Sequence, residues 1–235
     1  MRFHSAKNAL FAIKKIVVSA HQSCAKPVFC LITGASVLLG GCALPDKPTR
    51  PTMYDFGPGA FATQADASPA PTAPVPALSP LALADVATAG GSLDNMAVLY
   101  RLGYSDAQQL RPYSKARWSM PPAQLLRQRL RERLGQHRVV LNASEGVALN
   151  RSQNTHLPLL RLQLEEFSQV FSTPGSSVGL VRFHATLAEI TLAGERLIAQ
   201  RQFVVQRPAG SADAPGGVRA LTQASDAAID ELDQW

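Results

Sequence analysis

Apolar and polar residues alternate along several stretches of this chain, and a period of two places the apolar side chains on one face of a strand. The strands predicted in this way cover residues 81–87, 96–104, 108–113, 138–141, 160–167, 181–187 and 196–207. In the stretch 160–167 the alternation slips at Glu166-Phe167, which indicates a β-bulge. A turn at Ala193-Gly194-Glu195 joins the last two long strands into a hairpin.

Two segments have helical rather than alternating spacing. Leu126, Leu130 and Leu134 recur at every fourth position, after Pro121-Pro122 and before Gly135. Proline is favoured in the first turn of a helix and glycine directly after the last turn, so this helix has clear ends. A second helix closes the chain, with an apolar face of Val218, Leu221, Ala228 and Leu232. The order of elements predicts an α+β fold, a mainly antiparallel sheet with two helices packed on one face.

The first 41 residues have the pattern of a secretory leader. They contain basic but no acidic residues, and their apolar run, residues 27–39, is shorter than the roughly 20 residues of a membrane span. The run ends in Leu39-Gly40-Gly41-Cys42, the pattern of a bacterial lipobox. The small residues before the cysteine let the signal peptidase bind the backbone at the cleavage site, and the cysteine thiol accepts a diacylglyceryl group. We therefore expect a signal peptide over 1–41 and a lipidated Cys42. The alternative is an uncleaved anchor followed by a lone cysteine.

Removal of this leader changes the charge and the cysteine count. The full chain has a formal net charge of +6, but without the leader it keeps 18 basic and 17 acidic residues. A nearly neutral chain does not support binding to nucleic acid. Cys24 and Cys30 lie in the leader, so Cys42 has no partner for a disulfide.

Residues 42–80 are rich in Pro, Ala and Thr, and such a composition buries too little apolar surface to fold alone. We therefore expect an extended tether here, followed by a folded domain over 81–235. The segment Tyr54-Asp55-Phe56-Gly57-Pro58 interrupts the tether. This segment is either a short strand with both aromatic rings on one face or an aromatic interaction patch within the tether.

The sequence offers no convincing catalytic or metal-binding pattern. Beyond the leader, the three histidines His137, His156 and His184 lack metal-ligand spacing, and no Gly-x-Ser-x-Gly motif or phosphate-binding loop occurs. Glu165-Glu166 would point to opposite faces of a strand. We expect a protein that is not an enzyme and that holds no cofactor apart from the diacylglyceryl and N-acyl lipid on Cys42.

Two groups of residues are candidates for binding. Tyr113, Arg117 and Trp118 combine the side-chain types of interface hot spots, but Trp118 can equally fill the core while Arg117 stacks on it. We favour the interpretation in which Trp118 fills the core and Arg117 stacks on it.

The second group is a row of arginines on the first helix, at Arg127, Arg129, Arg131 and Arg133. This basic face can meet anionic lipid headgroups, above all through Arg127 and Arg131. Alternatively it pairs with the closing helix, whose acidic residues are Asp226, Asp230, Glu231 and Asp233. Because the mature charge is nearly neutral, pairing is favoured.

Several of these features together resemble one family, the ABC-type transport auxiliary lipoproteins, which include the paraquat-inducible C lipoprotein. The shared motifs are Tyr100-Arg101, Tyr113, Arg117-Trp118, Pro121-Pro122 and the leucine-rich helix over 125–134. The segment Tyr54-Asp55-Phe56-Gly57-Pro58 resembles the first strand of relatives, with Phe56 in place of leucine. The resemblance spans residues 53–235, and it makes 53–58 the first strand of the domain.

The resemblance implies an accessory subunit of a lipid transporter in the cell envelope. Its expected partners are a mammalian-cell-entry (MCE) protein that holds lipid and the ABC permease and ATPase, and relatives suggest a homo-oligomer. Ala43 follows the lipidated cysteine where an aspartate would favour the inner membrane, so we expect an outer-membrane anchor facing the periplasm. The alternative function is an outer-membrane assembly or scaffolding lipoprotein without lipid cargo.

Overall fold

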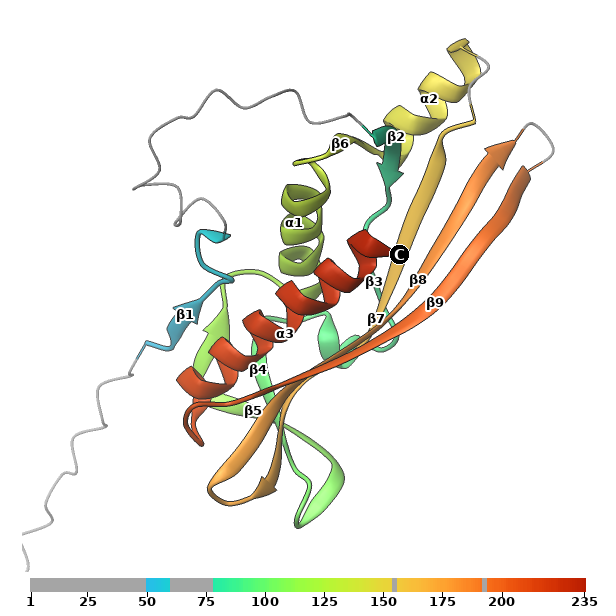
Figure 1. Ribbon diagram of the computed structural model, residues 1–235. Coiled ribbons are helices and arrows are strands. Elements are labelled where there is room, and N and C mark those ends of the chain that lie inside the picture. The colour runs from blue at the N-terminus through green and yellow to red at the C-terminus, as the bar shows by residue number, and fades with distance from the viewer. Residues whose placement is uncertain (1–49, 60–77, 154–155, 192–193) are drawn as a thin grey trace, which may run out of the picture. The chain divides into compact units, whose positions relative to one another are not determined.

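A computed structural model of the chain describes residues 50–59, 78–153, 156–191 and 194–235 (Figure 1). All of them belong to one unit of the chain, Pro48–Trp235. The expected leader and Cys42 lie outside the described residues, as do much of the expected tether and part of the turn at Ala193-Gly194-Glu195.

Nine strands and three α-helices make up the described fold. The strands are β1 (Thr52–Tyr54), β2 (Leu78–Leu83), β3 (Ala87–Thr88), β4 (Ala97–Leu102), β5 (Asp106–Trp118), β6 (Arg138–Asn142), β7 (Pro158–Thr173), β8 (Ser176–Thr191) and β9 (Gly194–Pro208). The helices are α1 (Pro122–Leu134), α2 (Ala143–Gln153) and α3 (Ala214–Gln234), with a 3-10 turn at Gly91–Leu93. Since β1 and β2 belong to the sheet, the folded unit extends N-terminal of residue 81.

Strand β7 is the centre of the sheet. Along one edge it pairs with β8 in antiparallel orientation, and β8 pairs in the same way with β9. Along its other edge it receives β2, β3 and β4 one after another, all parallel. Strand β5 lies beyond β4 and carries β1 on its outer side, while β6 lies beyond β2. The predicted bulge is confirmed, because the β7–β8 register shifts between Leu164 and Glu166.

The sheet is therefore mixed, and the expectation of a mainly antiparallel sheet was wrong. Of the eight pairings among the described strands, five are parallel and three are antiparallel. The physical reason lies in the connections: a helix between two strands returns the chain to the starting end of the sheet, which makes the strands parallel. α2 does this between β6 and β7, which both run parallel to β2. β3 and β4 are parallel to β7 because they follow β2 along the same edge in the same direction.

Helix α2 was not predicted, and its packing explains why. Its sequence carries a glycine, Gly146, in a short segment with few apolar residues. Glycine lowers helix propensity. Here a Cβ atom on Gly146 would lie only 2.6 Å from the Cβ of Ala82, so the helix can approach β2 only because this position lacks a side chain. Tertiary contact thus outweighs local propensity.

The other two helices lie together over one face of the sheet, α3 running across β7, β8 and β9 with α1 beside it (Figure 1). Between helices and sheet lies the core, whose largest fully buried side chains include Trp118, Leu126, Leu130, Phe167, Phe183, Phe203, Leu221 and Ile229. The residues of this main core cluster span 56–232. The unit Pro48–Trp235 thus contains its own core, and we expect it to fold without the preceding residues.

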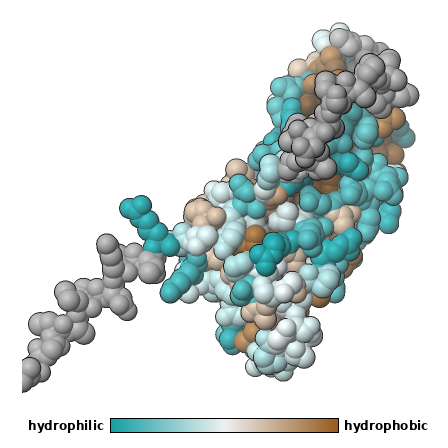
Figure 2. Space-filling view, turned by 60° about the vertical axis from the view of Figure 1, so that its left-hand side comes forward, coloured by the Kyte–Doolittle hydropathy of each residue, from teal (hydrophilic) through white to brown (hydrophobic). Residues whose placement is uncertain are grey.

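Polar side chains form pairs on the face of the sheet opposite these helices. The expectation that Glu165 and Glu166 point to opposite faces was wrong, because the bulge between Leu164 and Glu166 turns both to this face. Glu165 accepts hydrogen bonds from Arg182 and Gln202, at 3.1 and 3.0 Å. Glu166 forms an ion pair with Arg101 at 3.0 Å and accepts a hydrogen bond from Ser168. On the side of the molecule seen in Figure 2, apolar residues appear in separate small patches within a largely hydrophilic surface. The face opposite α1 and α3 is only partly open to solvent, because Glu166 and Ser168 are buried and α2 packs against Ala82 and Leu157.

Asp213 begins α3 by accepting a hydrogen bond from the backbone N–H of Gly216 at 2.8 Å. The Ser211 hydroxyl and this N–H lower the pKa of Asp213 below its usual value. We predict that Asp213→Ala lowers the free energy of unfolding by about 0.5–2 kcal/mol, whereas Asp213→Asn, which keeps the acceptor, loses less. Urea unfolding at pH 7 measures both.

The same pair of variants tests the charge on Asp213. A lowered folded-state pKa contributes stability that is complete above the unfolded pKa of about 4 and is lost as the pH falls through the folded value. The difference between wild type and Asp213→Asn should therefore shrink as the pH is lowered below about 4. A difference that stays constant across this range would contradict the assignment.

Candidate functional site

The segment that follows β1 is attached to the domain by aromatic packing. Phe56 is buried, with its ring edge-on to Trp118 at 5.8 Å between centroids and stacked with Phe167 at 6.0 Å. Trp118 and Phe167 also meet edge to face, at 5.6 Å. Edge-to-face and offset rings at such distances attract beyond the area they bury. Three parts of the chain, the β1 segment, β5 and β7, therefore share one cluster.

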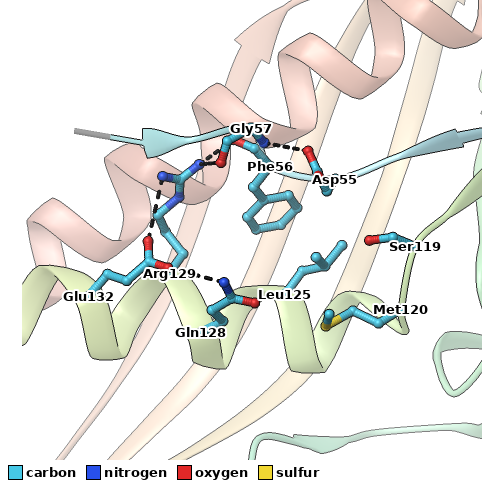
Figure 3. Close-up of a pocket in the computed structure, with 9 residues that line it drawn as sticks. All are labelled: Asp55, Phe56, Gly57, Ser119, Met120, Leu125, Gln128, Arg129 and Glu132. Atoms are coloured by element: carbon cyan, nitrogen blue, oxygen red, sulfur yellow. Dashed lines mark hydrogen bonds and ion pairs between the residues drawn. The ribbon is translucent and has the colours of Figure 1, made fainter. Parts of the chain in front are cut away.

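Arg129 of α1 holds the same segment from the other side. Its guanidinium donates hydrogen bonds to the carbonyls of Phe56 and Gly57, and Figure 3 shows it reaching up to the backbone at Gly57. Its Nε lies 3.2 Å from Asp226 of α3, and its Nη1 lies 3.8 Å from Glu132. Burial raises the pKa of Asp226, the dominant effect, while Arg129 lowers it. Arg129 thus joins the N-terminal segment to both helices.

A small cavity of about 220 Å³ lies under this contact (Figure 3). Phe56, Leu125 and Met120 form its apolar wall, and its polar lining comprises Asp55, Ser119, Gln128, Arg129 and Glu132. The carboxylates and the guanidinium already satisfy one another or the backbone around it. The cavity therefore suits packing or a small polar molecule.

The three residues Tyr113, Arg117 and Trp118 do not form one exposed patch. Trp118 is fully buried in the aromatic cluster. Half-buried Tyr113 donates a hydrogen bond to Gln169 at 2.7 Å, and burial, with smaller contributions from Tyr100 and Asp213, raises the pKa of its hydroxyl. Arg117 does not stack on Trp118 as expected; its guanidinium donates to the carbonyls of Tyr113 and Ala116. These contacts make the group part of the framework of β5.

The arginines of α1 separate into two rows. Arg129 and Arg133 face α3, where Arg133 lies 3.0 Å from Asp230 and 3.9 Å from Asp233. Arg127 and Arg131 turn away from α3 and donate to the side-chain oxygen of Asn142, each at 2.9 Å. Pairing between the helices therefore holds for one row only. Helical geometry could have revealed this, because positions four apart share a face and positions two apart do not.

Two polar partners in this region carried no signal in the sequence. Gln169 is fully buried on β7, where it accepts from Tyr113 and donates to Ser177. Asn142 ends β6 and brings Arg127 and Arg131 together. Both depend on strand pairing between distant segments, which periodicity alone does not specify.

The remaining predictions concern the lipidated cysteine, the membrane and metal ligands. Cys42 lies outside the described residues. No helix among the described residues is long and apolar enough to span a membrane. Within the same parts of the chain, no three side chains of His, Cys, Asp or Glu gather as metal ligands would.

Comparison with known proteins gives a family and a fold. The family model of the ABC-type transport auxiliary lipoprotein component matches residues 62–232, which confirms the resemblance based on the sequence motifs. The solved structure of XCC0632 from Xanthomonas campestris, of family DUF330, has a TM-score of 0.57 and 20% identity over 70% of this chain and 88% of that one.

A structure described as an uncharacterized protein has a TM-score of 0.54 and 15% identity over 79% of this chain and 97% of that one. At such identities the two structures support the fold and not the activity. Among curated proteins, none matches this chain significantly.

Gly59 and Gly57 allow a direct test of the Arg129 contact. Both have positive φ, 62° and 67°, where a side chain costs roughly 1–2 kcal/mol. A Cβ atom on Gly59 would lie 1.8 Å from Nη1 of Arg129, whereas Gly57 has open space. We predict that Gly59→Ala destabilises the domain more than Gly57→Ala does, measured by urea unfolding.

A double-mutant cycle isolates the cause of that difference. In an Arg129→Met background the extra cost of Gly59→Ala should disappear, because no guanidinium remains to be displaced. If the extra cost persists in this background, Arg129 does not hold the segment in the way described.

Proposed function

Because this chain belongs to the ABC-type transport auxiliary lipoprotein family, we propose that it is the lipid-anchored periplasmic subunit of a transporter that moves lipid between membranes. The family match over residues 62–232 is the observation that carries the proposal. Membership makes the chain a lipoprotein component auxiliary to ABC-type transport. The anchor, the membrane and the cargo are the parts we propose.

The position of β1 supports a domain held near a membrane. Strand β1 begins at Thr52, ten residues after Cys42. A fully extended chain spans at most about 3.6 Å per residue, so a lipid on Cys42 keeps β1 within about 36 Å of the membrane surface. The domain would therefore work beside the membrane that holds it.

The outer membrane is the proposed location because Ala43, not an aspartate, follows Cys42. From there the domain can meet a partner that crosses the periplasm. We propose an MCE-type lipid-binding protein as that partner, with its ABC permease and ATPase at the other membrane.

The anchor is tested by Cys42→Ser. Acyl chains contribute about 0.8 kcal/mol per buried methylene, so the two chains of a diacylglyceryl group give stable membrane attachment. We predict that the variant keeps its leader, lacks lipid and leaves the outer-membrane fraction, whereas Cys30→Ser behaves as wild type. Mass spectrometry of the N-terminus gives the readout. A wild-type protein with a mature but unacylated N-terminus would overturn the anchor.

The partner is tested with the unit Pro48–Trp235, which contains its own core. We predict that it co-purifies with the MCE protein encoded beside it and not with an MCE protein from an unrelated operon. Circular dichroism verifies that both proteins are folded. Absence of co-purification would contradict the transport role. Capture of outer-membrane assembly components instead would favour a scaffolding lipoprotein without cargo.

A further inference from the structure

One side of α1 presents two arginines to a groove that the contacts described so far do not fill. Arg127 and Arg131 lie one helical turn apart, and each donates one hydrogen bond, at 2.9 Å, to the same side-chain oxygen of Asn142. The groove beside them has a volume of about 630 Å³. A cavity of this size accommodates a small organic molecule. We call it the α1 groove, lined by Asp85, Val86, Met120, Ala123, Gln124, Arg127, Gln128 and Arg131.

The charges in the α1 groove do not balance locally. A guanidinium has five N–H donors, and the Asn142 carboxamide is neutral. Among the described residues, the one carboxylate that lines the groove is Asp85, whose side chain is 94% exposed and lies 3.0 Å from Nε of Arg127. Glu145 is nearby in sequence, but its carboxylate accepts from the backbone N–H of Asn142. An exposed carboxylate is strongly screened by water, so two positive groups face the groove with weak compensation.

On the opposite side of α1, carboxylates compensate the charge of the arginines. Arg129 contacts Asp226 and Glu132, and Arg133 contacts Asp230 and Asp233. Every arginine of that row has a carboxylate from α3. Asn142 stands at the corresponding place for Arg127 and Arg131, and it aligns the two guanidinium groups without neutralising them.

We propose that the α1 groove binds a phosphate-bearing anion between Arg127 and Arg131. Guanidinium groups bind phosphate oxygens through paired, charge-assisted hydrogen bonds. Gln124 and Gln128 add amide groups for hydroxyls on the ligand, and Val86, Met120 and Ala123 add an apolar wall. This lining fits a glycerophosphate group, which can come from a phospholipid headgroup or from a soluble phosphoester. The inference rests on the groove alone and not on the transport role.

Calorimetric titration of the unit Pro48–Trp235 with glycerol 3-phosphate tests the site. We expect saturable binding that weakens with salt and falls about tenfold or more in the double variant Arg127→Gln/Arg131→Gln. The matched control is Arg207→Gln/Arg219→Gln, which removes the same charge from exposed positions outside the groove. It should bind as wild type does.

Asn142→Asp separates binding from folding. The new carboxylate would stand between the two guanidinium groups and neutralise their charge. Glycerol 3-phosphate binding should therefore fall about tenfold or more, while thermal stability is kept or raised. Equal losses in the groove variant and the control would show diffuse attraction and overturn the site. Wild-type binding by Asn142→Asp would overturn it as well.

Vesicle sedimentation identifies the source of the anion. The same proteins are mixed with vesicles of phosphatidylglycerol or, for comparison, phosphatidylcholine. Binding to phosphatidylglycerol that the groove variant loses and the control keeps assigns a lipid headgroup, with or without binding of the soluble compound. Specific binding of glycerol 3-phosphate alone assigns a soluble phosphoester. If neither probe binds, the proposal is wrong.

Discussion

Burial of Trp118 against Phe56 and Phe167 is the contact on which the rest of this domain depends. The indole belongs to the last residue of β5, directly before the chain turns into α1. Phe167 comes from the central strand β7, and Phe56 from the segment after β1. One cluster therefore fixes where α1 starts, where β5 lies relative to β7, and where the N-terminal segment attaches. Loss of any of its rings would leave a large cavity where these three segments meet.

Charge on α1 follows from that arrangement. The helix is placed between α3 and β6, so its two rows of arginines meet different chemistry. On one side, Arg129 and Arg133 meet carboxylates of α3; on the other, Arg127 and Arg131 meet the Asn142 amide, and Arg127 also meets the exposed carboxylate of Asp85. A single basic helix thus contributes stability with one row and leaves the other row able to bind. Counting charges along the sequence gives no hint of this division, whereas a helical projection does.

The sequence predicted local structure well where one periodic pattern acts alone. The ends of α1, the bulge in β7 and the β8–β9 hairpin all follow from residues that are close in the chain. It failed where distant segments decide. Gly146 looks like a break in a helix until Ala82 is seen against it, and the direction of the strand pairs depends on the crossover that this helix provides.

The candidate site divides in the same way. The motifs around Tyr113, Arg117 and Trp118 were recognisable, but their role depended on burial, which the pattern left open. Asn142 and Gln169 could not be foreseen, because their partners arrive from other strands and helices. Family membership could be recognised because it depends on spaced motifs.

The way the N-terminal segment enters the sheet has a mechanical consequence. Strand β1 pairs with β5 in parallel over Thr52–Tyr54, and Phe56 and Arg129 follow within a few residues. Any tension on the chain before Arg50 therefore enters the domain at this point and not at α3 or the β8–β9 hairpin. The short ladder carries the load first, and the buried ring and the guanidinium carry it next. A pulling force on the N-terminus would thus break these contacts one after another before it reached the central strand β7. The N-terminal segment would therefore detach before the rest of the fold bears the force.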